Sequence, residues 1–151
     1  MDSDRLKHSY AVAKKMQEIG KSIGLGNKEL EELFLLGLNH DIGYEFSPDG
    51  KKHNEIGGEV LRDSGFRYWK EVYYHGLLTS EYNSRYLDIL NCADMQIDKY
   101  GNDVGFEKRL KDKESRFGAE SIVYLRCKSM VEYLKNKNLI NGLIENDIER
   151  D

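Results

Sequence analysis

The sequence predicts an all-α fold, a single helical bundle of five to seven helices. Apolar residues recur at intervals of three and four positions through most of the chain, as on the buried face of a helix. The alternation of apolar and polar residues that is typical of strands is missing. The only proline, Pro48, lies in the turn-forming sequence SPDG and interrupts no helix. Because 151 residues suit one hydrophobic core, residues 1–151 are expected to form one domain.

The first two predicted helices carry clear apolar faces. Residues 4–22 are expected to form the first helix, whose inner face is made by Leu6, Tyr10, Ala13, Met16 and Gly20. Asn27 is a suitable N-cap for the second helix, and Glu29 lies near its positive end. The inner face of the second helix is made by Leu30, Leu33, Phe34, Gly37 and Leu38. This helix runs into Asn39-His40-Asp41 and is expected to stop near Gly43.

Shorter helices are expected after a loop over residues 44–52. The third has an inner face of Ile56, Gly57, Val60 and Leu61 and ends at Ser64-Gly65, and a short fourth covers residues 68–73. The fifth places on one face Leu87, Leu90, Asp94 and Ile97. C-terminal helices are expected within residues 115–148: a sixth defined by Ile122, Val123, Met130, Val131 and Leu134, and a tail helix from Ile140. Residues 107–116, EKRLKDKESR, mix bases with acids and are interpreted as a solvated face or loop.

Composition and charge indicate a globular protein that does not bind duplex nucleic acid. Charged residues make up 33% of the chain and hydrophobic residues 39%. The net charge is −4, whereas proteins that grip duplex DNA or RNA usually carry a basic surplus. The N-terminal MDSDRLKHSY is polar and no apolar run approaches membrane-spanning length, so a cytoplasmic protein without membrane contact is expected. Cys92 and Cys127 are expected to be reduced core residues.

Several ionisable residues share helix faces with apolar ones. His8 and His53 each lie three or four positions from apolar residues, and Asp94 lies inside an apolar stripe. A carboxylate on a core face is costly unless a cation or hydrogen-bond donors meet it. A divalent cation would meet that need and explain the histidines, because imidazole and carboxylate together suit iron, manganese, zinc or nickel. Taken singly, each residue could instead be a hydrogen-bonded core residue, and His40 and Asp41 could cap the second helix.

The order of these residues resembles the HD superfamily of metal-dependent phosphohydrolases. His8, the pair His40-Asp41 and Asp94 follow one another on consecutive predicted helices, and residues 40–43 read HDIG, the form found in the HDIG subgroup. The resemblance covers about residues 5–100, through the stretches RLKHSYAVAKKM, LLGLNHDIGY, HNEIGGEVLRDSGF and ILNCADMQID.

The resemblance implies a ligand set for a binuclear metal centre. The residues that match the first metal site of the family are His8, His40, Asp41 and Asp94. His53 and His75 match the two further histidines that hold a second ion in binuclear members, in which the aspartate of the HD pair bridges both ions. Two divalent ions are therefore expected, iron or manganese ahead of zinc, nickel, cobalt or magnesium. His40 and Asp41 become the expected catalytic residues.

The implied activity is hydrolysis of a nucleotide or another small phosphate ester by metal-activated water. A bound divalent ion lowers the pKa of water towards about 7, which supplies hydroxide at neutral pH. Arg5 is the first candidate for binding substrate phosphate, because its planar guanidinium fits a phosphate group. Lys51 and Lys52 directly precede His53, and Tyr44 could stack on a base or sugar.

Two alternatives to this general activity stay open. One is a diadenosine polyphosphate hydrolase, and the other is a non-catalytic regulatory domain that binds metal or nucleotide. The cyclic-dinucleotide phosphodiesterases of the family are disfavoured, because they usually have lysine after HDIG, where this chain has Tyr44, and their GYP sequence is absent after His75. A homodimer is compatible with each of these functions.

Overall fold

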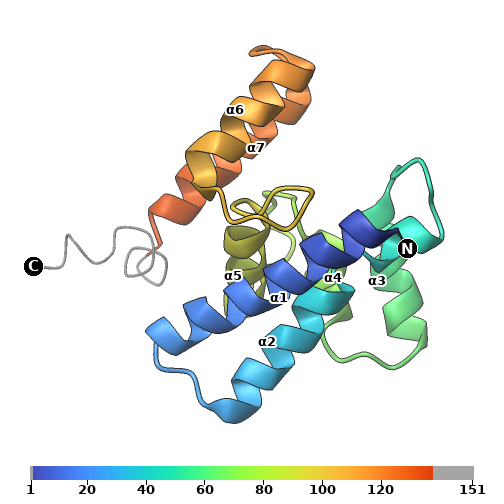
Figure 1. Cartoon of the computed structure of the whole chain (residues 1–151). Coiled ribbons are helices and arrows are strands. Elements are labelled where there is room, and N and C mark those ends of the chain that lie inside the picture. The colour runs from blue at the N-terminus through green and yellow to red at the C-terminus, as the bar shows by residue number, and fades with distance from the viewer. Residues whose placement is uncertain (1, 138–151) are drawn as a thin grey trace, which may run out of the picture.

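The computed structural model describes residues 2–137, and the described part of the chain is helical, without a regular strand (Figure 1). The elements are α1 (Ser3–Ser22), α2 (Asn27–Asn39), the 3-10 helix η1 (Ile42–Glu45), α3 (His53–Asp63), α4 (Trp69–Tyr74), α5 (Arg85–Asp94), α6 (Gly105–Phe117) and α7 (Ile122–Lys135). The predicted all-α fold class is confirmed. The tail helix predicted from Ile140 lies outside the described residues.

The centre of the core lies where α1 crosses α2 and α5. Side chains without any exposed surface come from all three helices, among them Val12, Met16, Leu33, Leu36 and Leu90. In the N-terminal half of α1 the buried face is formed by His8, Ser9 and Val12. Leu6 and Tyr10, predicted to face inward, lie on another face of the helix and are 56% and 53% exposed.

The remaining helices flank this centre on two sides. Helices α3 and α4 pack against each other beside the N-terminal end of α1 (Figure 1). Helices α6 and α7 form an antiparallel pair that projects away from α1 and α2 (Figure 1). The C-terminal half of α7 joins the core through Met130, Val131 and Leu134, whereas Ile122 and Val123 at its start are 65% and 40% exposed. The predicted inner face of this helix is therefore correct only in its second half.

Three local predictions differ from the structure. The N-cap of α2 is Gly26 rather than Asn27, and the Gly26 N–H donates to Glu29 Oε1 at 2.9 Å. Helix α5 ends at Asp94, three residues before Ile97, which instead forms an isolated antiparallel bridge with Asp103. Residues 107–116, interpreted as a solvated face or loop, belong to the helix α6 and are mostly exposed, as on a solvated face, but one side of this helix lies at a pocket described below.

Glycine at position 37 allows α1 and α2 to approach closely. A Cβ atom at Gly37 would lie 2.5 Å from Ala13 Cα and 2.9 Å from Ala13 N, both backbone atoms that cannot move without moving α1. This approach brings His8 on α1 and His40, directly after α2, into the same part of the molecule.

We expect Gly37→Ala to lower the free energy of unfolding by about 2 kcal/mol. The overlap with the α1 backbone outweighs the gain of about 1 kcal/mol in helix propensity. The measurement is urea denaturation followed by circular dichroism, with Glu31→Ala, an exposed position on the same helix, as the matched control. An unchanged midpoint for Gly37→Ala would contradict the packing described here.

Candidate metal centre

Six side chains that lie far apart in the sequence meet at one place in the fold. Five of them stand at or next to the end of a helix, and only His8 comes from within one. His40 and Asp41 follow α2, His53 begins α3, His75 follows α4 and Asp94 ends α5. His8, His40, Asp41 and His75 are buried, whereas the side chains of His53 and Asp94 are 25% and 18% exposed.

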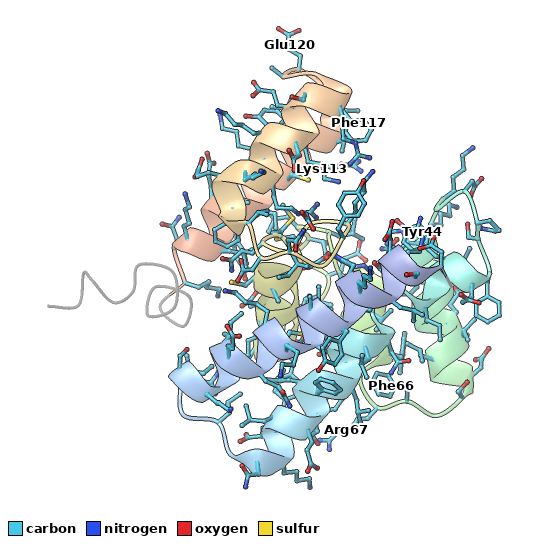
Figure 2. The ribbon with its side chains drawn as sticks, viewed as in Figure 1. Tyr44, Phe66, Arg67, Lys113, Phe117 and Glu120 are labelled. Carbon is cyan, nitrogen blue, oxygen red and sulfur yellow. The ribbon has the colours of Figure 1, made fainter. Side chains whose placement is uncertain are left out.

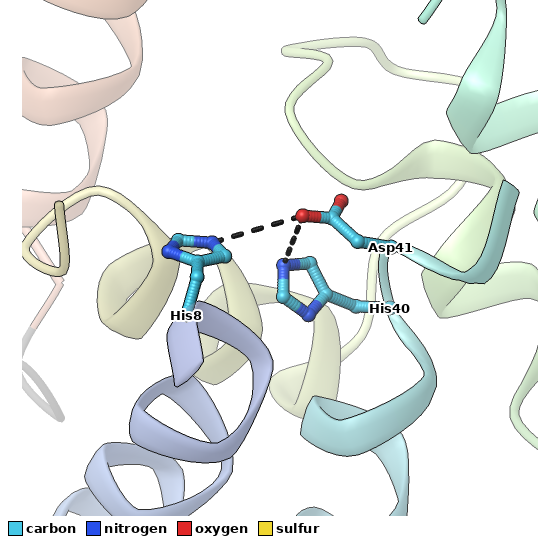
Figure 3. Close-up of side chains that lie close together, drawn as sticks. All are labelled: His8, His40 and Asp41. Carbon is cyan, nitrogen blue, oxygen red and sulfur yellow. Dashed lines mark ion pairs between the residues drawn. The ribbon is translucent and has the colours of Figure 1, made fainter. Parts of the chain in front are cut away.

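One half of the cluster joins two imidazoles to two carboxylates. His8 Nε2 lies 2.9 Å from Asp94 Oδ1 and 3.7 Å from Asp41 Oδ2. His40 Nε2 lies 3.4 Å from each of the same two oxygens. Figure 3 shows Oδ2 of Asp41 facing both rings.

The other half of the cluster uses the second oxygen of Asp41. Oδ1 of Asp41 lies 3.4 Å from His53 Nε2 and 3.4 Å from His75 Nε2. The six residues form three overlapping groups, in each of which the ligand atoms lie within 4.8 Å of one another. Asp41 therefore stands between two pairs of histidines, with one carboxylate oxygen directed at each pair.

Main-chain carbonyl groups fix the orientation of all four imidazoles. His40 Nδ1 donates to Gly37 O at 2.7 Å and His75 Nδ1 to Val72 O at 2.6 Å. His8 Nδ1 and His53 Nδ1 donate to the carbonyl oxygens of Asp98 and Gly50, at 2.9 and 3.2 Å. Because a carbonyl oxygen only accepts, each Nδ1 carries the hydrogen, and a neutral ring presents its Nε2 lone pair to the centre.

These lone pairs face oxygen atoms that are also acceptors, which is unfavourable unless a cation lies between them. Within the part of the chain that the structure describes, the fully buried His40 Nε2 has no hydrogen-bond partner. Buried polar atoms without partners are rare in proteins. A divalent ion would satisfy Nε2 and the carboxylate oxygens together, and a mixed nitrogen and oxygen donor set suits transition metals. The residues present therefore fit a divalent metal ion.

In the absence of such an ion, protons take its place. Burial lowers the pKa of His40, but the charges of Asp41 and Asp94 outweigh it and raise the pKa to about 9. Burial likewise raises the pKa of Asp41 and of Asp94, but the neighbouring imidazoles, His40 first, hold both pKa values well below the usual range. The centre thus keeps two ionised carboxylates inside the fold.

The glycine of HDIG allows α3 to reach this centre. A Cβ atom at Gly43 would overlap with the carbonyl oxygen of His53, and one at Gly57 would lie 2.9 Å from Gly43 N. Residues 43 and 57 therefore pack backbone against backbone, which brings the first residue of α3, His53, within reach of Asp41.

A pocket of about 290 Å³ opens beside the cluster and is lined by His8, Asp41, His53 and Asp94. Arg5 and Tyr44 also line it, as predicted for substrate-binding residues, but the Tyr44 ring is covered on both faces. The Arg5 guanidinium lies 3.3 Å over the ring centre, and the His53 ring stacks at 4.3 Å. Both groups approach the ring centre closely, so they must occupy opposite faces, and stacking of a base on Tyr44 has no room.

Two other predicted substrate-binding residues do not line the pocket, and four cationic residues that were not predicted do. Lys51 and Lys52 are exposed and are not among the residues that line this pocket. The additional lining residues are Lys99, Arg109, Lys113 and Arg116. Three of these belong to α6, at spacings of four and three residues. The spacing of Arg109, Lys113 and Arg116 in the sequence would place them on one face of a helix. The acidic residues between them led instead to the interpretation as a mixed, solvated segment.

One of the comparisons with known proteins identifies a family for this chain. A family model described as "HD domain" matches residues 5–116, about three quarters of the chain. The chain belongs to the HD domain family. HD domains are generally metal-dependent hydrolases with an all-α fold. Comparison of this HD domain with curated proteins and with solved structures gave no match. None of the helices in residues 2–137 combines the length and the apolarity that a bilayer crossing requires.

The metal-free HD domain should lose stability as the pH rises from about 6.5 to about 9. The folded pKa of His40 lies above its ordinary value of 6.5, so the bound proton stabilises the fold below that pH, and the stabilisation is lost as the pH passes 9. The shift corresponds to a few kcal/mol, on the order of 3. The measurement is chelator-treated protein unfolded by urea at several pH values.

The same titration with saturating manganese is the control for this pH dependence. There the decline should be absent, because ligation requires neutral imidazole. A metal-free protein with equal stability at pH 6.5 and pH 9 would contradict the proposed role of the His40 proton.

Proposed function

We propose that this HD domain hydrolyses a nucleotide or another small phosphate ester at a centre of two divalent metal ions. The observation that carries the proposal is the position of Asp41. Each of its two oxygens faces a separate pair of imidazole Nε2 atoms, at distances of 3.4–3.7 Å. A carboxylate in that position suits a bridge between two ions.

The cluster divides into two ligand sets that share Asp41. The first comprises His8, His40, Asp94 and Oδ2 of Asp41, and the second comprises His53, His75 and Oδ1 of Asp41. The first set has more donor atoms and its residues are more buried, so we expect it to bind its ion more tightly than the second set does. Iron or manganese is the expected metal, because both accept mixed imidazole and carboxylate ligands.

Divalent ions held by these two ligand sets would supply water with a pKa of about 7 and would neutralise phosphate oxygens, and the other roles belong to the chain's own residues. The four carbonyl groups that accept from Nδ1 hold the imidazoles neutral and aligned at the centre. Arg5, supported by the Tyr44 ring, lies at the pocket and can donate to a phosphate oxygen. We expect substrate to enter from the side on which His53 and Asp94 are partly exposed.

Replacement of Asp41 should abolish turnover without unfolding the protein. Asp41→Asn keeps the shape of the side chain but removes the charge that both ligand sets require, so activity should fall at least about a hundredfold. The assay is a panel of nucleotides and generic phosphate esters with added manganese or iron, and circular dichroism checks the helical signal. Asp63→Asn, an exposed carboxylate at the end of α3, is the matched control.

The products of this panel also separate the alternatives. Release of two nucleotides from a diadenosine polyphosphate, with little activity on simple esters, would identify that narrower hydrolase. Tight nucleotide binding without turnover under any metal would replace the proposal with a non-catalytic binding domain.

Gly43→Ala should reduce the metal content from two ions to one per chain. The added Cβ pushes the His53 carbonyl away and so removes His53 from the second ligand set, while the first set keeps all its donors. Metal analysis of protein purified without chelator measures this ratio, and Ser115→Ala at an exposed position is the control. Two ions retained in Gly43→Ala, or one ion in the wild type, would contradict the assignment of two ligand sets.

A further inference from the structure

The pocket beside the metal centre is lined by more positive charge than its carboxylates balance. Its cationic residues are Arg5, Lys99, Arg109, Lys113 and Arg116, whereas its only acids are Asp41 and Asp94. The carboxylates of both acids lie next to imidazoles of the metal centre, so they are not available to pair with these cations. The chain as a whole has a net charge of −4, so this positive concentration is local.

Three of the cations share one face of α6. Arg109, Lys113 and Arg116 follow one another at i, i+4 and i+7, the spacing of neighbours on a helix surface. Like charges at this spacing destabilise a helix. No carboxylate in residues 2–137 forms an ion pair with any of the three, although Lys135, on α7, pairs with Glu107 of α6 at 2.9 Å. Within the described residues this row of charges therefore lacks an ion-pair partner.

The row begins beside the metal centre itself. Arg109 Nη2 donates to the main-chain oxygen of Asp94 at 3.3 Å, and the buried Arg109 Nε has no hydrogen-bond partner among residues 2–137. Lys113, one turn further along, is half-buried, and its burial and the Arg109 charge lower its pKa. Arg116 is exposed at the outer end of the row. Figure 2 shows Lys113 on the projecting α6–α7 pair and Tyr44 beside the N-terminal end of α1.

The two sides of the pocket therefore offer different amounts of positive charge. Arg5, lying on Tyr44, provides one guanidinium on the α1 side. The α6 side provides three cations in a row that spans two helical turns. A single phosphate at the metal centre could not contact the whole of such a row, whereas a chain of linked phosphates could follow it.

We propose that Arg109, Lys113 and Arg116 form an anion site for the phosphate groups of the substrate that are not cleaved. The substrate then carries a chain of at least two linked phosphates, one at the metal centre and the others along α6. This inference rests on the proposed function for its reaction, but the anion site itself is a property of α6 and can be measured without turnover.

The test is isothermal titration of the full chain, as purified, with inorganic tripolyphosphate and with inorganic phosphate. The variant Lys113→Gln/Arg116→Gln should bind tripolyphosphate at least about tenfold more weakly than the wild type, since each charged contact contributes of that order. Its binding of phosphate should change less than threefold. Lys108→Gln/Lys111→Gln removes the same charge from exposed positions of the same helix that do not line the pocket, and it should change neither value.

Three outcomes would overturn the anion site. They are no tripolyphosphate binding by the wild type, equal weakening for both anions, and equal weakening in the two double variants. Arg116→Gln alone, at an exposed position, keeps the test valid if the double variant is poorly folded, and it should weaken tripolyphosphate binding about three- to tenfold.

Kinetics then separate this inference from the proposed function. With ATP as a substrate that has a phosphate chain and AMP as one that has a single phosphate, the double variant should raise KM for ATP about tenfold or more and leave KM for AMP nearly unchanged. Selective tripolyphosphate binding in a protein that hydrolyses neither nucleotide would retain the anion site and overturn only the hydrolase. If the protein hydrolyses AMP and the double variant has no selective effect on the KM for ATP, the hydrolase is retained and the anion site is overturned.

Discussion

The compensation of two buried carboxylates is the constraint on which the arrangement of the helices depends. Asp41 and Asp94 are charged and largely removed from water, and each meets imidazole Nε2 atoms rather than an arginine or lysine. Because the Nδ1 atoms are already bound to carbonyl groups, the imidazoles can offer only a lone pair or an additional proton. Either a cation or an added proton must therefore compensate the carboxylates, so the binding of an ion at this cluster would be coupled to folding through the same six side chains.

Helix ends explain how such a cluster can be both structural and reactive. The last carbonyl groups of a helix lack intrahelical partners and accept from side chains near the end. His40 and His75 each donate Nδ1–H to the carbonyl three residues earlier, so each satisfies the end of its own helix. The same bond turns Nε2 towards Asp41. Capping and metal ligation, which compete as explanations when only the sequence is read, are thus compatible roles for one imidazole.

The sequence predicts the fold class and the cluster better than it predicts the pocket. Periodic apolar residues require helices, so the fold class follows from local patterns. Local patterns indicate only that a carboxylate on an apolar face, such as Asp94, needs a partner, and the full set of six residues is what the resemblance to the HD superfamily implies. The end of α5 at Asp94 depends on a turn in which the Asp98 carboxylate accepts from the N–H groups of Tyr100 and Asn102, and no periodicity reports that turn. The covered ring of Tyr44 and the pocket face of α6 depend on contacts between distant segments. The spacing of residues along α6 could reveal the row Arg109, Lys113 and Arg116, but it could not reveal that this row lines the pocket.

Charge connects the two proposals for this HD domain. Asp41 and Asp94 alone would repel an anionic substrate at short range, whereas divalent ions reverse the sign of the centre. The row on α6 has no such dependence, because arginine remains protonated at any physiological pH and its charges need no ion. A phosphate chain would therefore be attracted to α6 before the metal centre contributes, and the end of the chain would then lie next to Asp94, where Arg109 meets α5. In a protein of net negative charge, this local field would draw anions towards one opening, and the attraction would weaken as salt screens it.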